Sequence, residues 1–266
     1  LMLATNVIAG TDGENNLSKK NSGVIKDCFE SLNRATFKFN EVIDGAILKP
    51  VAKAYRVLPS PVRDGTGNAL DNLSTLITIP NNVLQGDFKK AGVNAGRFIL
   101  NTTVGIVGIF DVAEKVGFPE YEREDYGQTL GVMGVGEGCY LVLPVLGPST
   151  IRDTAGSFIN IFGGDPWYNA SVSGNNEFLS KSDYVVTKII SGIDFRAKNI
   201  DSFENLQKNS IDFYASIKSL YLQDRQQKIK NTNKTLEIIY DADWEAVSYT
   251  HLRAHETPEH LVCRLL

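Results

Sequence analysis

In the first patterned stretch of the chain, mostly apolar residues recur at steps of three and four, which places them on one face of a helix. The next helix is marked by Pro50, which suits a first helical turn. The positions of the first face are Phe29, Leu32, Thr36, Phe39, Ile43, Ala46 and Ile47, and those after Pro50 are Val51, Ala54, Tyr55 and Leu58. This spacing predicts two successive amphipathic helices.

The same spacing continues over residues 62–79, where Leu70, Leu73 and Ile77 share an inner face. We expect Pro80 to end this helix, because proline removes a hydrogen bond and clashes inside a helix. Residues 81–87 then predict a short helical turn closed by Gly86.

Two longer helices are predicted near the C-terminus. The first runs from Glu177 to about Lys198. The second begins at Asp201, an N-cap with Glu204 three residues later in a capping-box arrangement, and reaches about Ile229.

Residues 89–117 combine an apolar run with closely spaced small residues, Ala91, Gly92, Ala95 and Gly96, that allow another helix to approach. Asn94, Arg97 and Asn101 argue against a membrane-spanning segment. Two interpretations stay open for this stretch, a tightly packed buried helix and a helix lying at membrane depth.

Residues 131–153 are too rich in glycine for a stable helix and too apolar for an ordinary surface loop. Only 139–147 offers a candidate strand, and we expect Pro144 to spoil it. Together the patterns predict a mainly α, single-domain protein without internal repeats, and with a Gly-rich hairpin.

The composition argues against several classes of function. A net charge of −4 gives no basic surface for nucleic acid, and no stretch of 18 apolar residues predicts a spanning helix. The acidic run at 119–126 is interpreted as a solvated surface rather than as paired catalytic carboxylates.

Catalytic and metal chemistry find little support in the sequence. All three histidines, His251, His255 and His260, lie in the last stretch with Cys263, at spacings that match no common zinc site. No Gly-x-Ser-x-Gly motif occurs, so we predict neither an enzyme nor a cofactor. Cys28 is interpreted as a small packing residue; a bridge to Cys139 stays open for an oxidising compartment.

The chain is expected to divide into five segments. Residues 1–10 resemble the end of a signal peptide, with a mature start near Thr11, and 11–26 read as a disordered linker. Residues 27–232 form the helical domain and 233–249 an extension. Residues 250–266 resemble translated adapter sequence and are expected to be dispensable.

Several blocks occur in the order found in the MlaA/VacJ family of Gram-negative outer-membrane proteins, which this chain resembles over about 29–229. The blocks are "LNRATFKFNEVID" (32–44), "LKPVAKAY" (48–55), "NNVLQGD" (81–87), "RFILNTTVGIVGIFDVA" (97–113), "YGQTLGVMGVGEGCYLVLPVLGPSTIRD" (126–153), "IDFRA" (193–197) and "YASIKSLYLQDRQQKI" (214–229). Two departures are the absence of a visible lipidated cysteine and Cys28 where the family usually has proline.

The resemblance implies a ring of amphipathic helices around a central channel, embedded in the inner leaflet of the outer membrane. Phospholipids that have strayed into the outer leaflet would enter this channel and pass to a periplasmic carrier protein, and family members commonly associate with trimeric porins. A porin-binding envelope scaffold that conducts no lipid is the alternative, and a lipid hydrolase is a more distant one.

The hairpin at 131–147 is interpreted as a gate, flexible through its glycines and apolar because it faces lipid; a plain tight turn is the alternative. The expected gate residues are Gly131, Gly134, Gly136, Gly138, Tyr140 and Leu141. Channel or membrane positions are expected at Phe37, Phe39, Asn40, Phe98, Asn101, Val104 and Ile106. We also expect a belt of exposed apolar side chains within 29–47 and 99–110.

Overall fold

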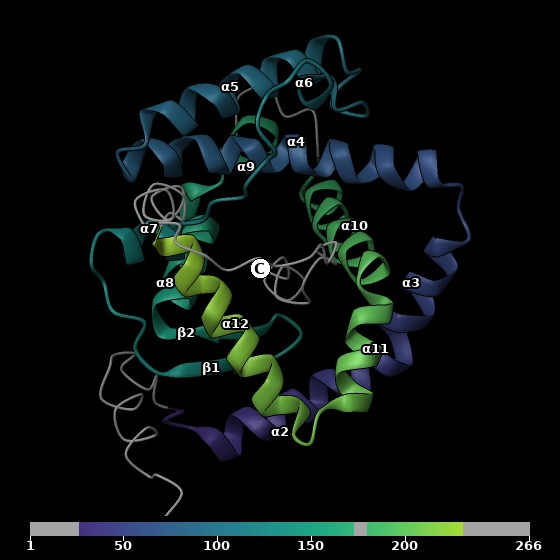
Figure 1. The fold of residues 1–266 in the computed structure, drawn as a ribbon, viewed down its shortest axis with the longest axis vertical. Coiled ribbons are helices and arrows are strands. Elements are labelled where there is room, and N and C mark those ends of the chain that lie inside the picture. The colour runs from purple at the N-terminus through teal and green to yellow at the C-terminus, as the bar shows by residue number, and fades with distance from the viewer. Residues whose placement is uncertain (1–26, 173–179, 231–266) are drawn as a thin grey trace, which may run out of the picture.

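The computed structural model describes residues 27–172 and 180–230. The expected segments at 1–10, 11–26, 233–249 and 250–266, like the start of the helix predicted at Glu177, lie outside the described residues. In the described part the chain is mainly helical, and its elements are arranged around a ring, with α5 and α4 at the top of Figure 1 and α2 at the bottom. This confirms the mainly α fold class.

The first arc of the ring is one nearly continuous helix. It comprises α2 (Glu30–Ile43), a π-helical segment η1 (Asp44–Leu48) and α3 (Lys49–Arg56). Pro50 lies in the first turn of α3, as predicted. Arg196 reaches η1 and makes two hydrogen bonds to Asp44, with Nε to Oδ1 at 2.7 Å and Nη2 to Oδ2 at 2.8 Å.

The second arc pairs α4 (Ser60–Leu84) with α5 (Phe88–Thr103), followed by the short α6 (Val112–Lys115). The prediction that Pro80 ends α4 was wrong, since the helix continues to Leu84 and closes at Gly86, whose φ is +79°. Buried side chains beyond the proline hold this last turn in place: Asn82 accepts a hydrogen bond from Asn94, and Asn81 accepts one from Thr129. These contacts outweigh the local cost of proline.

The third arc contains α7 (Tyr126–Val132), strands β1 (Tyr140–Leu143) and β2 (Gly147–Thr150), then α8 (Ile151–Ile159), η2 (Asn160–Gly164) and α9 (Pro166–Ser171). The strands pair antiparallel, with Tyr140 opposite Thr150 and Leu143 opposite Gly147. The expectation that Pro144 would spoil a strand was wrong, because this proline lies in the turn after β1, where the ladder requires no N–H.

The last arc consists of α10 (Lys181–Lys198), α11 (Ile200–Asn209) and α12 (Phe213–Ile229). One long helix was predicted where α11 and α12 stand. The chain instead turns at Asp212, which caps α12 by accepting from Ala215 N and also pairs with Arg34. Asn199, rather than Asp201, precedes α11, and Asp201 pairs with Arg56.

The interior of the described structure is more polar than apolar. It buries 23 polar or charged residues and 13 hydrophobic ones. The largest apolar cluster joins Tyr140 and Val142 of β1 to Tyr214, Ile217 and Tyr221 of α12. This cluster fixes the hairpin between α2 and α12, and so sets the geometry of the candidate site.

Candidate functional site

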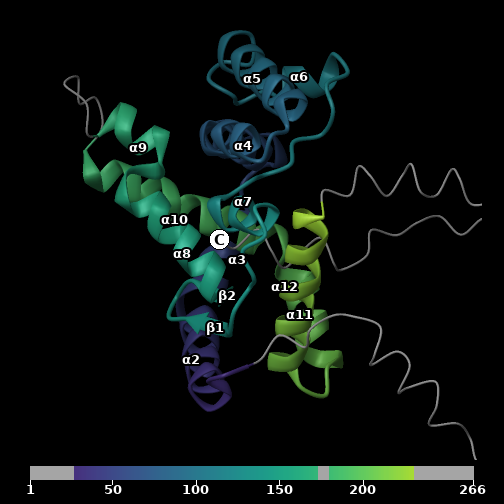
Figure 2. The ribbon, with the colours of Figure 1, turned by 90° about the vertical axis from the view of Figure 1, so that its left-hand side faces the viewer.

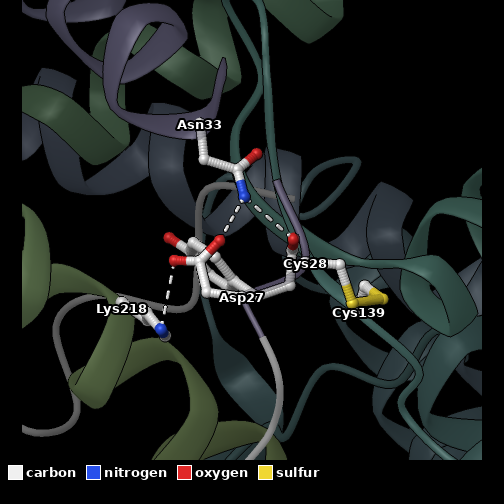
Figure 3. Close-up of a disulfide and its surroundings, with 6 residues drawn as sticks. Asp27, Cys28, Asn33, Cys139 and Lys218 are labelled. Carbon is white, nitrogen blue, oxygen red and sulfur yellow. Dashed lines mark hydrogen bonds and ion pairs between the residues drawn. A yellow bond between two sulfur atoms is a disulfide. The ribbon is translucent and has the colours of Figure 1, made fainter. Parts of the chain in front are cut away.

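A disulfide joins the start of α2 to the base of the hairpin. Cys28 and Cys139 are bonded, with their Cα atoms 5.6 Å apart and 111 positions apart in the chain (Figure 3). The interpretation of Cys28 as a mere packing residue was therefore wrong. Asp27 stands beside the bridge and accepts from Lys218 Nζ at 3.1 Å, which also ties α12 to this corner.

Two asparagines of α2 complete the backbone hydrogen bonding of the hairpin. Asn33 donates through Nδ2 to Tyr140 O at 3.0 Å and accepts from Val142 N at 2.9 Å. Asn40 repeats the pattern, donating to Leu143 O at 2.9 Å and accepting from Val145 N at 2.8 Å. Since the two asparagines are seven positions apart, they share one face of the helix. Their amides satisfy one free edge of the sheet as a third strand would.

The glycine loop, defined here as residues 133–139, lies between α7 and this anchored hairpin. Gly134 and Gly138 have φ of +90° and +72°, a left-handed conformation that glycine adopts without steric cost. A Cβ at Gly134 or Gly136 would meet nothing within 4 Å, whereas one at Gly138 would meet Ile151 at 3.1 Å. Free space therefore surrounds the middle of the loop and packing returns at its end.

Three of the residues expected in the gate belong instead to α7 and β1. Gly131 is the penultimate residue of α7, and a Cβ there would come within 2.6 Å of Ile229. Tyr140 is fully buried, with its ring edge-to-face against Tyr214 and Tyr221. Leu141 is half-buried on β1. The gate assignment stays a prediction, and the freedom it needs lies in the glycine loop.

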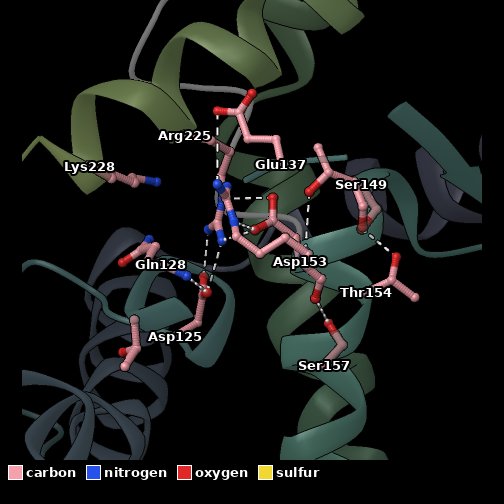
Figure 4. Close-up of polar contacts among 12 residues, drawn as sticks. Asp125, Gln128, Glu137, Ser149, Asp153, Thr154, Ser157, Arg225 and Lys228 are labelled. Atoms are coloured by element: carbon pink, nitrogen blue, oxygen red, sulfur yellow. Dashed lines mark hydrogen bonds and ion pairs between the residues drawn. The ribbon is translucent and has the colours of Figure 1, made fainter. Parts of the chain in front are cut away.

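A network of buried charges lies beneath the glycine loop (Figure 4). Arg225 of α12 bonds to Asp125 through Nη1 at 2.6 Å and Nη2 at 2.9 Å, and to Asp153 of α8 through Nη2 at 2.8 Å. Tyr221 donates to Asp153, and Arg152 Nε donates to Asp153 at 3.1 Å. Burial alone would raise the pKa of Asp153, but Arg225 outweighs it and lowers that pKa. No separate sequence pattern indicated this network, whose members are up to 100 positions apart.

The acidic run at 119–126 is solvated only in its first part. The interpretation of the whole run as a solvated surface was wrong for its last residues. Asp125 caps α7 and pairs with Arg225. Glu124 is 5% exposed and accepts from Gln85 Nε2 at 3.0 Å. Burial raises the pKa of Glu124 to about 7.

Large apolar side chains are exposed along several elements of the ring. In 29–47 and 99–110 they confirm the expected belt: Phe29, Leu32, Phe39, Val42, Ile47, Ile99, Val104, Ile106, Val107, Ile109 and Phe110. Others continue it on α8, η2 and α10: Ile151, Phe158, Ile159, Ile161, Phe162, Val185, Val186, Ile189 and Ile190. We call these two sets the apolar belt.

The remaining side of the ring has a different surface. On α11 and α12 every residue with a large exposed side chain is polar, and the turn between them exposes the single apolar residue Ile211. Figure 2 shows these two helices on the side opposite α8, α9 and α10. The surface of α11 and α12 is thus polar, whereas α8 and α10 on the opposite side expose large apolar side chains.

The loop after α5 presents its apolar residues in a strained conformation. Ile106 and Val107 have φ of 53° and 57°, which β-branched residues rarely adopt, and are 58% and 65% exposed. Gly108 lies close against Asn72 of α4, and Asn68 donates to Ile109 O at 3.1 Å. Packing on α4 holds the backbone while the two side chains face outward.

The other expected channel or membrane positions fall into two groups. Phe39, Val104 and Ile106 belong to the apolar belt, whereas Asn101 is buried and bonds to Asp111 Oδ1 and Ala113 N. Phe98 is half-buried, and Phe37 packs edge-to-face on Phe213 and Tyr214.

Across residues 27–172 and 180–230, every helix is too short or too polar to cross a membrane. Within the same residues, no group of three or more His, Cys, Asp or Glu is arranged to hold a metal ion.

The fold and surface define a helical ring with a polar interior and an apolar belt. The sequence pattern of the MlaA lipoprotein family matches residues 25–228, and the chain belongs to this family. It is 35% identical over 202 residues to the intermembrane phospholipid transport system lipoprotein MlaA of Escherichia coli K12, covering 74% of this chain and 76% of the relative. The Haemophilus influenzae protein of that name is 30% identical over 233 residues, covering 86% and 89%.

Two further comparisons agree. An uncharacterised protein of Rickettsia felis is 33% identical over 208 residues, covering 77% of this chain and 79% of the relative. A solved structure described as "Structural basis for maintenance of bacterial outer membrane lipid asymmetry" superposes with a TM-score of 0.67 at 33% identity. It covers 77% of this chain and 99% of the other.

Proposed function

We propose that this protein takes part in phospholipid transport at the outer membrane of a Gram-negative bacterium. It would remove phospholipids from the outer leaflet through the centre of its helical ring and pass them to a periplasmic carrier protein. The family membership and the names of the E. coli and H. influenzae relatives support the transport role.

The observation that carries the proposal is the inverted distribution of polar and apolar residues. A soluble monomer buries most of its large apolar side chains, whereas this ring buries Asn82, Asn94 and Arg97 between helices and exposes its belt. In lipid, helices gain little by burying apolar surface against one another, so small residues and interhelical hydrogen bonds hold them together. The belt suits a ring lying within one leaflet, which needs no spanning helix.

The disulfide supports a location outside the cytoplasm. Disulfides persist in oxidising compartments, including the bacterial periplasm. With the belt in the inner leaflet of the outer membrane, α11 and α12 would face the periplasm and meet the carrier. A trimeric porin is the partner proposed to hold the ring in the membrane.

The strained loop offers a test that separates lipid binding from folding. Asparagine tolerates positive φ better than Ile106 or Val107, so the double variant Ile106→Asn, Val107→Asn should fold at least as stably as the wild type. Loss of the two half-exposed side chains should weaken binding to phospholipid vesicles by about 2 kcal/mol, roughly 30-fold. Ile211→Asn is the matched control on the polar side and should bind vesicles normally.

The same variants are then tested for transport in a bacterium that lacks its own copy of the family. Outer-leaflet phosphatidylethanolamine is measured on intact cells with a membrane-impermeant amine reagent. We expect the wild type and Ile211→Asn to clear it and the double variant to leave it. If the double variant binds vesicles as well as the wild type, the apolar belt no longer supports the proposed function. If the wild type associates with the porin but clears no lipid, the alternative function, a porin-binding scaffold that conducts no lipid, is favoured.

A further inference from the structure

Glu137 is the charged residue of the glycine loop, and it turns inward. Its side chain is 16% exposed, and its Oε1 lies 3.9 Å from Arg152 Nη1 (Figure 4 shows Glu137 beside the network). Its backbone carbonyl accepts from Arg152 N at 3.2 Å. The end of the loop is thus attached to α8 by two backbone hydrogen bonds, since Cys139 O also accepts from Ile151 N at 3.1 Å, and Glu137 adds the one side-chain contact, a long ion pair.

Arg152 is buried but incompletely paired. Its side chain is 3% exposed, and its Nε is occupied by Asp153. Its Nη2 has no hydrogen-bond partner within the described residues. Buried guanidinium groups normally use such donors, because an unmade hydrogen bond in the interior is costly. Arg152 therefore offers unused binding capacity directly beneath the glycine loop.

The charges around Arg152 make Glu137 the carboxylate most easily replaced. Asp125 and Asp153 together balance the charges of Arg225 and Arg152, and both hold Arg225 at 2.6–2.9 Å. Glu137 is the additional acid and makes the longest contact of the group. Burial raises the pKa of Glu137 more than Arg152 lowers it, in keeping with a weak pair.

We propose that Arg152 binds the phosphodiester of a phospholipid that reaches the glycine loop, and that the phosphate takes the place of Glu137. A guanidinium engages a phosphate through two parallel N–H donors, and Nη1 and Nη2 would supply them. Release of the Glu137 side chain would then leave the loop held to α8 by backbone hydrogen bonds alone, so that its middle part can move more freely. This inference rests on the proposed function, since it names the lipid group that operates the predicted gate.

The surroundings favour a lipid over free phosphate. Met133 and Val135 on the glycine loop, with Val145 and Leu146 at the hairpin tip, are 46–61% exposed. Met133 and Val135 belong to the loop that is bonded to Arg152, so this region offers apolar side chains to the acyl chains and a buried cation to the headgroup of one phospholipid molecule. Inorganic phosphate would use only the cation.

Hydrogen exchange of the full oxidised chain in uncharged detergent tests the idea, read at the amides of residues 133–139 and at Arg152. The probes are dihexanoyl-phosphatidylglycerol, dihexanoylglycerol and inorganic phosphate. We expect the phospholipid to speed exchange about fivefold and the other two to leave it unchanged. An equal effect of dihexanoylglycerol would overturn the role of the phosphate, and an equal effect of inorganic phosphate would overturn the choice of a lipid.

Two variants complete the test. Glu137→Gln should speed loop exchange about fivefold without lipid while the melting temperature stays unchanged, and Glu120→Gln, an exposed acid outside the network, is its control. Arg152→Lys keeps the charge beside Asp153 but should lose the response to the phospholipid. If Glu137→Gln exchanges like the wild type without lipid, or Arg152→Lys responds normally, the inference is wrong.

Lipid clearance in cells separates the two proposals. If the wild type clears outer-leaflet phospholipid but its loop ignores the phospholipid probe, the inference fails and the proposed function stands. If the loop responds as expected but the wild type clears no lipid, the proposed function fails.

Discussion

Replacing Cys28 and Cys139 by serine tests how much of the hairpin's position depends on the disulfide. The bond closes a loop of 111 residues. The chain-entropy estimate for a loop of this length is roughly 4–5 kcal/mol, and measured bridges more often contribute about 2–4 kcal/mol. Because Asn33 and Asn40 hold the same strand by four hydrogen bonds, the fold should survive. We expect a loss of about 2–4 kcal/mol.

For a domain of this size, each kcal/mol lowers the melting temperature by about 2–4 °C, so the expected fall is roughly 5–15 °C. Helical circular dichroism is followed on heating in one detergent for the oxidised wild type, the reduced wild type and the double serine variant. The last two should melt together, and either single serine variant should match them. Cys263→Ser should melt like the wild type.

A melting temperature of the double variant within about 1 °C of the oxidised wild type would refute this reasoning, because the asparagine contacts would then suffice alone. Alkylation followed by mass spectrometry supplies an independent check. The oxidised chain should take up one alkyl group, at Cys263, and the reduced chain three. Uptake of three groups without reductant would show that the bridge does not form.

Three further changes are predicted. Burial raises the pKa of Glu124 from 4.5 to about 7, so the folded state binds this proton more tightly than the unfolded state and stability falls as pH rises from about 5 to 8. Glu124→Gln should melt like the wild type at pH 5 and gain about 1–3 kcal/mol at pH 8 in denaturant titrations. Gly134→Ala, at φ +90°, should cost about 1–2 kcal/mol, whereas Gly136→Ala should be neutral; equal effects would contradict this. Asn40→Ala should lower the free energy of unfolding by about 1–2 kcal/mol and speed hydrogen exchange of the Val145 amide. An unchanged exchange rate would argue against the hydrogen bond that Asn40 accepts from this amide.

Local patterns predicted most of the helices because amphipathic spacing survives in any environment that has an apolar and a polar side. Phe29 and Phe39 share a helical face whether that face meets protein or lipid. What the pattern did not show is which of the two it meets. The predicted inner residues of 62–79 illustrate this, since Ile77 is buried while Leu70 and Leu73 are not fully so, and Asn72 and Thr75 occupy the interior.

The errors arise where contacts distant in sequence outweigh local preference. Pro80 lies inside a helix because Asn81 and Asn82 beyond it bond to other segments. Cys28 and Cys139 are brought together only by the closing of the ring.

The candidate site was predictable to a similar degree. Positive φ among the glycines follows from residue type, whereas the exposure of the apolar belt was expected because of the resemblance to a membrane-embedded family. The clamp formed by Asn33 and Asn40 also had a signal in the sequence, because two amides seven positions apart share a helical face. The pairing of Arg152 and Arg225 with their acids had none, since it depends on α7, α8 and α12 meeting.

The polar interior would allow the proposed gate of this protein to be small. A ring whose helices are joined by directed hydrogen bonds and ion pairs keeps its shape in lipid, where apolar packing alone specifies little. Such bonds are strong when complete, so Asp153 and Arg225 anchor α8 and α12 firmly. Where a contact in the network is long, as between Glu137 and Arg152, we expect the attached segment to detach first. With Cys139 fixed on one side and α7 on the other, the proposed movement would be confined to the loop between them. In the proposed function, a lipid passing the ring would therefore displace residues 133–138 and the ion pair of Glu137 with Arg152, while the helices stay in place.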